Sequence, residues 1–197
     1  MGRVVVYLND KAVGTRGTGC ASHRTHKARN ACCVAGRCAA ASAFVLLILD
    51  QLTKLVVEHH MELGESIPVI KGFFSLTYVT NLGAAWGIFH GYGMVLFAIG
   101  VAVLLLALRF LRKLADGCSE RYFAILTVLS GVVGNSIDRV WRGAVVDFLD
   151  CYIGKHHWPA FNVADCAICI GIGIYALSVL LRPEPEKTVA SDRENAA

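Results

Sequence analysis

The sequence predicts an all-α membrane protein with four transmembrane helices and a small extracytoplasmic β-hairpin or sheet. Of its 197 residues, 55% are hydrophobic and only 17% are charged, and the mean hydropathy is +0.54. Soluble domains carry about 25% charged residues. Four stretches are long enough to cross a hydrocarbon core, which needs roughly 20 mostly apolar residues in a helix.

Polar connections separate these four stretches. The expected spans are residues 39–57, 92–111, 122–140 and 161–181. Together they make one membrane domain, 39–182. The basic segment 1–38 has no periodicity and the segment 183–197 is short and polar, so both are expected to be disordered tails.

Lysine and arginine are concentrated in the N-terminal tail, the link 109–121 and the C-terminal tail, whereas the segment 58–91 contains only Lys71. Cytoplasmic loops carry an excess of basic residues. Both termini are therefore expected in the cytoplasm, and the two longer connections on the opposite side. The net charge of +4 fits cytoplasmic tails at an anionic lipid surface and does not predict nucleic-acid binding.

Polar side chains gather at the outer ends of three predicted spans. They are Asp50, Lys54, Asn135, Asp138, Arg139, Asn162 and Asp165. A charge at mid-span costs about 2.5 to 3.5 kcal/mol on insertion scales, so such groups normally face a bundle interior or a water-filled pocket. Spacings of three and four residues put each set on one helix face. Three helices can therefore direct polar groups at one shared site.

Structural roles are the alternative for several of these residues. Asp50 with Lys54, and Asp138 with Arg139, can be ion pairs that hold helices together. The two asparagines can equally be hydrogen-bonding contacts between helices.

Asp147 and Asp165 differ, because neither has an evident basic partner in its own segment. Two carboxyl groups in a partly dry site do not both ionise, and the pair titrates as a unit. Its ionised member can take a proton from water while its protonated member polarises a scissile carbonyl. This pattern predicts hydrolysis, and the rival interpretation is a small multispan transporter or lipid-binding protein in which the two aspartates carry protons or an ion. Asp150 is interpreted as a solvated loop carboxylate.

Four ordered blocks carry a resemblance to a known family. They are "DQLTK" from residue 50, "TNLGAAWGIF" from 80, "GNSIDRVWRGAVVDFLD" from 134 and "FNVADCAICIG" from 161. In this order they resemble the signature blocks of lipoprotein signal peptidase, or signal peptidase II, over residues 43–181. Trp86 stands where the second block usually has phenylalanine.

The resemblance implies a bacterial inner-membrane aspartyl protease with its active site at the extracytoplasmic face. Such an enzyme removes the signal peptide of diacylglyceryl-modified prolipoproteins, cutting before the lipidated cysteine. Asp147 and Asp165 match the catalytic dyad. The matching substrate-binding and supporting positions are Asp50, Lys54, Asn81, Asn135, Arg139 and Asn162. We expect prolipoproteins and membrane lipids as partners, a monomer, no metal and no cofactor.

Two outer segments complete the prediction. The region 63–81 is rich in β-branched and aromatic residues around "KG", which predicts a hairpin, with an irregular interfacial loop as the alternative. The segment 141–160 is expected to be a mobile loop that covers the site. The histidine pairs 59–60 and 156–157 suggest solvated side chains more than a metal site.

Overall fold

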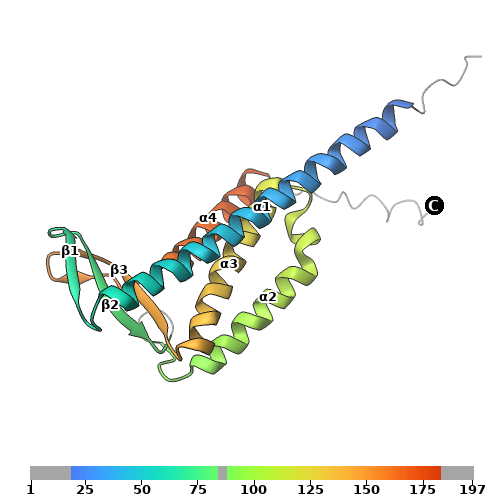
Figure 1. Ribbon diagram of the computed structural model, residues 1–197. Helices are drawn as coiled ribbons and strands as arrows, with labels where there is room; N and C mark the ends of the chain where they lie inside the picture. The colour runs from blue at the N-terminus through green and yellow to red at the C-terminus, as the bar shows by residue number, and fades with distance from the viewer. Residues whose placement is uncertain (1–18, 84–87, 183–197) are drawn as a thin grey trace, which may run out of the picture.

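The computed structural model describes residues 19–83 and 88–182, with side chains from residue 36 onward (Figure 1). These ranges contain four helices and four strands. In chain order they are α1 (Gly19–His60), β1 (Ser66–Ile70), β2 (Phe74–Asn81), α2 (Gly93–Ala115), α3 (Ser119–Trp141), β3 (Val145–Ile153), β4 (His156–His157) and α4 (Val163–Leu181).

All four predicted spans are helices long and apolar enough to cross a membrane. In α1 this part is Gly36–His60, but the helix begins at Gly19, well before the expected start at Ala39. Residues 19–38 are thus helical where a disordered tail was expected. A formed helix grows by one hydrogen bond per added residue, so an alanine-containing segment can extend it. The tail segments 1–18 and 183–197 lie outside the described residues.

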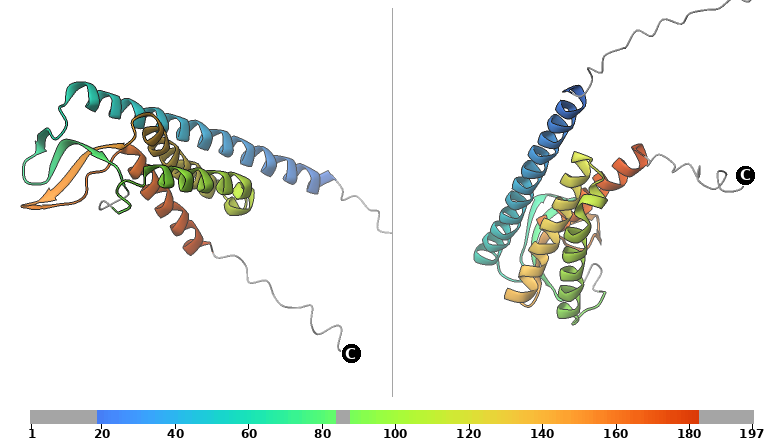
Figure 2. Two further views of the ribbon diagram at one scale, coloured as in Figure 1. Left: turned by 90° about the horizontal axis from the view of Figure 1, so that it is seen from below. Right: turned by 90° about the vertical axis from the view of Figure 1, so that its right-hand side faces the viewer.

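Helix α3 lies at the centre of the bundle and packs against α1, α2 and α4 (Figures 1 and 2). The contact with α4 is close because glycines lie where the two helices meet. A Cβ atom on Gly131 would collide with the carbonyl oxygen of Ala164, and one on Gly171 would lie 2.7 Å from the carbonyl oxygen of Ala124. Small residues therefore let the two backbones approach each other.

The strands form one antiparallel sheet in the order β1-β2-β3-β4. The predicted hairpin is confirmed: β1 pairs with β2 around a turn in which Gly72 has a φ of +85°. Strand β2 also pairs with β3, which places Val79 opposite Asp147. The expectation of a loop at 141–160 is wrong, because the segment contains β3 and the short strand β4. The run "VVDFLDCYI" is rich in β-branched and aromatic residues, and β2 supplies its backbone partners.

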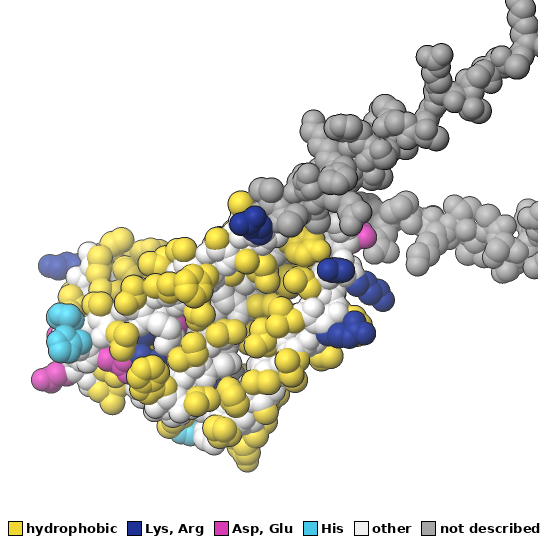
Figure 3. Space-filling view, turned by 45° about the vertical axis from the view of Figure 1, so that its right-hand side comes forward, with side chains coloured by type: hydrophobic (Ala, Val, Ile, Leu, Met, Phe, Trp, Pro, Cys, Tyr) yellow, Lys and Arg dark blue, Asp and Glu magenta, His cyan; other side chains and the backbone are white. Residues whose placement is uncertain are grey.

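The sheet lies at one end of the bundle, and the first turns of α1 and the end of α4 lie toward the other (Figure 1). Between these two ends the visible surface is largely hydrophobic, and several Lys and Arg side chains gather at the end opposite the sheet (Figure 3). Histidine and acidic side chains gather at the sheet end (Figure 3). Asp138 and Asn162 form hydrogen bonds with Val146 of β3, so the polar residues predicted at the outer ends of α3 and α4 lie beside the sheet.

Candidate active site

Asp147 and Asp165 face one cavity of about 540 Å³ between the sheet and helices α3 and α4. Asp147 is the third residue of β3 and is 2% exposed, whereas Asp165 lies in the first turn of α4 and is partly buried. Asn81 and Arg139 line the same cavity. The structure thus brings together two carboxylates that the sequence places 18 positions apart.

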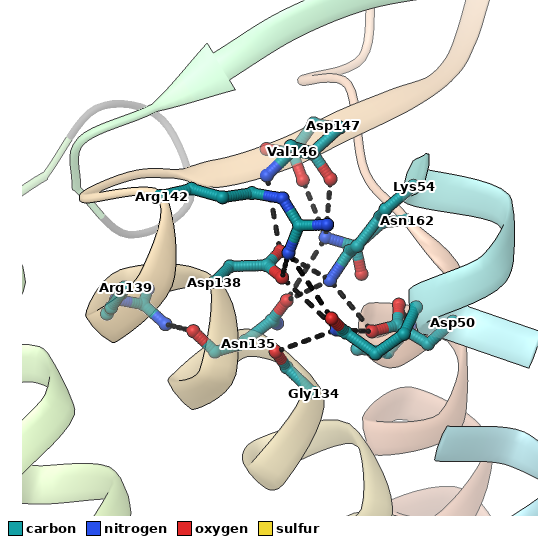
Figure 4. Close-up of polar contacts among 12 residues, drawn as sticks. Asp50, Lys54, Gly134, Asn135, Asp138, Arg139, Arg142, Val146, Asp147 and Asn162 are labelled. Carbon is teal, nitrogen blue, oxygen red and sulfur yellow. Dashed lines mark hydrogen bonds and ion pairs between the residues drawn. The ribbon is translucent and has the colours of Figure 1, made fainter. Parts of the chain in front are cut away.

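Asn162 contacts both carboxylates. Its side-chain amide donates to Oδ1 of Asp147 at 2.7 Å (Figure 4). Its main-chain N–H donates to Oδ2 of Asp165 at 3.2 Å, and its Oδ1 accepts from the N–H of Asp165 at 3.0 Å. The last two bonds form a capping box at the start of α4. One fully buried residue therefore positions both acids.

Two further asparagines donate to the same pair. Nδ2 of Asn135 lies 2.8 Å from Oδ1 of Asp165, and Nδ2 of Asn81 lies 3.1 Å from Oδ2 of Asp147. Hydrogen bonds to the amide oxygens define how both side chains are oriented. Oδ1 of Asn81 accepts from the N–H of Gly83, and Oδ1 of Asn135 accepts from Lys54. The asparagines thus direct N–H groups, and not oxygens, at the carboxylates.

A buried cluster of charged side chains holds the main chain next to the two carboxylates in place. Nζ of Lys54, which is fully buried, lies 2.9 Å from Asp50 and 2.7 Å from Asp138. Asp50 accepts from the N–H of Ala164 at 2.8 Å, and Asp138 accepts from the N–H of Val146 at 3.3 Å. The cluster therefore holds the first turn of α4 and the residue that precedes Asp147.

The predicted pairing of Asp50 with Lys54 is confirmed, but the alternative pairing of Asp138 with Arg139 is wrong. Asp138 pairs with Lys54 and with Arg142, the latter at 2.8 Å. Adjacent helix positions point in directions about 100° apart, so the side chain that meets Asp138 on its own helix is four residues away.

Arg139 points instead toward the cavity. It donates to the carbonyl oxygens of Asn135 at 2.9 Å and Gly83 at 3.2 Å, and so connects α3 to the chain just after β2. Trp86, the departure from the family block, lies outside the described residues.

Arg142 is a member of the network that the sequence analysis did not single out. It donates to Glu58 at 2.8 and 2.9 Å, and to Gln51 at 3.2 Å. Two signals were available: Arg142 is four residues after Asp138, and Gln51 and Glu58 are seven residues apart on one face of α1.

The interpretation of Asp150 as a solvated loop residue is wrong. Asp150 lies in β3, is 7% exposed, and accepts from the hydroxyl of Thr77 at 3.1 Å. Nδ1 of His157 lies 2.9 Å from its carboxylate, and the His157 ring stacks on Tyr152. Pairing with β2 explains the burial, because it places Asp150 opposite Ser75 in the sheet.

The environment of Asp147 raises the pKa of its carboxyl to about 7. Burial is the main cause, since it disfavours the charged form, and the nearby charge of Asp165 adds to it. Hydrogen bonds from Asn81 and Asn162, and the charge of Lys54, oppose the shift. The two carboxyl groups can therefore share one proton near neutral pH.

Comparisons with known proteins show which family the chain belongs to. The family model described as Signal peptidase (SPase) II matches residues 42–181. The lipoprotein signal peptidase of Geobacter sulfurreducens is 46% identical over 145 residues, covering 72% of this chain and 89% of that protein. The lipoprotein signal peptidase of Geobacter metallireducens is 44% identical over 140 residues, covering 69% and 86%.

A solved structure agrees as well. A bacterial membrane enzyme determined by the in meso method at 2.3 Å resolution has a TM-score of 0.67 and 37% identity to this chain, covering 75% of this chain and 91% of that one. The residues that the family model matches include most of the first span, the other three spans and the sheet. The chain belongs to the signal peptidase II family of membrane aspartyl peptidases.

Proposed function

We propose that the protein removes the signal peptide from diacylglyceryl-modified prolipoproteins and cuts before the lipidated cysteine, with Asp147 and Asp165 as its catalytic dyad. The observation that carries this proposal is the convergence of the two carboxylates on one cavity. The lipoprotein signal peptidases among its relatives support the substrate class.

The two acids divide the chemistry between them. The ionised member takes a proton from a water molecule in the cavity, and the protonated member donates a hydrogen bond to the scissile carbonyl. The water oxygen then forms a bond to the carbonyl carbon, which gives a tetrahedral intermediate. When the C–N bond breaks, a dyad proton passes to the leaving nitrogen, and the dyad is left with one proton. No oxidation state changes in these steps, so they require no redox cofactor.

The remaining polar residues position this pair and the substrate. Asn135 and Asn162 hold the carboxylates through the hydrogen bonds described above, and Asp50 with Lys54 holds the start of α4. Asn81 and Arg139 line the cavity, so they are the groups best placed to meet the substrate backbone.

The location of the cavity suits a substrate anchored in lipid. Its α4 wall includes Ile168, Cys169 and Ile170, of which the last two are exposed on the side of a membrane span. A lipidated substrate can approach along this wall while its peptide reaches the sheet. We propose that the chain lies in the bacterial inner membrane with both termini in the cytoplasm, since basic residues gather at the end opposite the cavity.

The test is cleavage of a diacylglyceryl-modified prolipoprotein in detergent micelles, followed by gel shift. Asp147→Asn and Asp165→Asn should each lower the rate by about 10²- to 10⁴-fold, as expected for loss of a general acid or base, while substrate binding remains. Asp150→Asn is the matched control, because it removes a buried carboxylate from the same strand outside the cavity, and it should cleave at nearly the intact rate.

Two results would contradict the proposal. One is an intact protein that does not cut lipidated substrate, and the other is a folded dyad variant that cuts as fast as the Asp150→Asn control. A carrier would instead move protons or ions across vesicles and release no cleaved peptide.

A further inference from the structure

A second cavity lies at the opposite end of the molecule from the dyad. Its volume is about 730 Å³, and it is a groove between α2 and α4. Val103, Leu106 and Phe110 of α2 form one wall, and Tyr175 and Val179 of α4 form the other. Volumes of this size are typical of small-molecule sites. The walls are apolar and belong to two membrane spans, which suits hydrocarbon chains.

The mouth of this groove is basic. Lys113, Arg121 and Arg182 line it, one from the end of α2, one from the start of α3 and one just after α4. Among the described residues, none of the side chains that line the groove is acidic. Figure 3 shows Lys and Arg side chains gathered at this end of the molecule beside hydrophobic surface.

Among the three basic residues, Arg121 is held in place by hydrogen bonds. Arg121 is 5% exposed; its Nε donates to the hydroxyl of Ser178 at 3.1 Å and its Nη2 to the carbonyl oxygen of Arg182 at 3.0 Å. A carboxylate lies near each arginine: Asp116 is 3.6 Å from Arg121, and Glu120 is 2.9 Å from Arg182. Neither carboxylate lines the groove, and Lys113 forms no ion pair within the described residues. The groove therefore presents a net positive mouth above an apolar interior.

We propose that this groove binds a membrane phospholipid with an anionic headgroup. The headgroup phosphate lies among Lys113, Arg121 and Arg182, and an acyl chain lies between α2 and α4. Basic pockets between transmembrane helices on the cytoplasmic side bind anionic lipid headgroups in this way. The charge complementarity selects an anionic lipid over a zwitterionic one, and the apolar walls select a lipid over a free phosphate.

A bound lipid also has a structural consequence. Helix α2 buries only Ala115 among its own residues, and the hydroxyl of Tyr175 donates to the carbonyl oxygen of Leu114 across the groove at 3.1 Å. A chain that fills the groove adds contacts between α2 and α4, so it should raise the unfolding temperature of the protein. This inference does not depend on the peptidase activity.

The experiment is native mass spectrometry of the full chain in detergent with phosphatidylglycerol or phosphatidylcholine of identical acyl chains, with thermal unfolding measured in parallel. The intact protein should retain phosphatidylglycerol at concentrations roughly tenfold or more below those needed for phosphatidylcholine. The double variant Lys113→Gln/Arg182→Gln should weaken phosphatidylglycerol binding by about 30-fold, as expected for the loss of two basic residues.

The matched control is Arg109→Gln/Arg112→Gln, which removes the same charge from the same end of α2 but from outside the groove. It should weaken binding by no more than about threefold, since these residues contribute only to the general surface field. Equal retention of the two lipids, or equal losses in the two double variants, would overturn the proposal. Binding of soluble glycerol phosphate as tight as that of phosphatidylglycerol would also overturn it, because the site would then recognise an anion without its chains.

Discussion

Asn162 and Asp147 lie on different elements, yet the side-chain amide of Asn162 donates to the carboxylate of Asp147 at 2.7 Å. The same asparagine begins α4 and forms a capping box with Asp165. The geometry of the dyad therefore depends on one residue that joins a helix terminus to a strand. Two functions of this residue can be separated, because its oxygen serves the helix and its N–H₂ group serves Asp147.

Asn162→Ser keeps an oxygen that can cap α4 but removes the amide donor, and Asn162→Ala removes both. We expect both variants to lose cleavage by about 10²-fold or more, since a preorganised hydrogen-bond donor typically contributes that much. The serine variant should be more stable than the alanine variant by about 1 kcal/mol, the usual contribution of an N-cap. Cleavage assays and thermal unfolding in detergent measure the two effects. Near-intact cleavage by the serine variant would show that the amide donor is dispensable.

The pH dependence of cleavage follows from the raised pKa of Asp147, about 7. Above that pH the dyad loses its shared proton and cannot polarise the scissile carbonyl, so the rate should fall on the alkaline side with an apparent pKa near 7. Asn81→Val removes a donor that stabilises the ionised form, and it should move this alkaline limb to higher pH. A rate profile from about pH 5 to 9, which is roughly the range in which the pair titrates, checks both points. An alkaline apparent pKa that is unchanged in Asn81→Val would count against Asp147 as the group that titrates.

The same shift has a consequence for stability. The folded protein keeps a proton on Asp147 that the unfolded chain has already released above its ordinary pKa of 3.8. This group therefore contributes stability that is complete below pH 3.8 and is lost as the pH rises through about 7. Asp147→Asn cannot titrate, so the free energy of unfolding of this variant should decline less between these pH values than that of the intact protein. Denaturant titrations in detergent at several pH values measure the difference, and identical slopes would contradict it.

The buried lysine offers a stability test. Lys54→Met leaves Asp50 and Asp138 without their shared cation, and breaking a buried pair in this way costs about 3 to 5 kcal/mol. Adding Asp50→Asn should recover part of that loss, because Lys54 is the one cation that pairs with Asp50 among the described residues, whereas Asp138 also pairs with Arg142. Thermal unfolding of the two single variants and the double variant completes the cycle. Simple addition of the two single effects would show that the residues are not coupled.

The close contact of α3 with α4 offers a second stability test. Gly131→Ala places a methyl group against the carbonyl oxygen of Ala164, and such overpacking typically costs about 1 to 3 kcal/mol. Gly173→Ala is the matched control on α4, since a Cβ there meets no atom within 4 Å, and it should be neutral or slightly stabilising. Cleavage should fall only in the first variant, because Ala164 precedes Asp165. Equal unfolding temperatures would exclude this account of the glycine.

Residue periodicity was sufficient to predict the spans and the polar faces, because both depend on local spacing. The β1–β2 hairpin was predictable for the same reason. Strand β3 was not, since its partner β2 is distant in the sequence and a strand is defined by its pairing as much as by its composition. The partners of Asp138 were also missed: Arg142 is local, but Lys54 comes from another helix. Nothing in the spacing of Asn162 and Asp147 indicated their hydrogen bond.

The charge cluster also bears on how the chain enters the membrane during biosynthesis. Asp50 and Lys54 lie four residues apart on α1 and pair at 2.9 Å, and Asp138 near the end of α3 pairs at 2.8 Å with Arg142, the residue that follows the helix. Asp50 and Asp138 therefore each have a counter-ion in their own segment, which lowers the cost of placing these carboxylates in lipid before the neighbouring helices arrive. Lys54 can contact Asp138 only after the two helices have met. The ion pairs that support the dyad in the finished enzyme are therefore also suited to lowering the cost of translocon release for each helix separately.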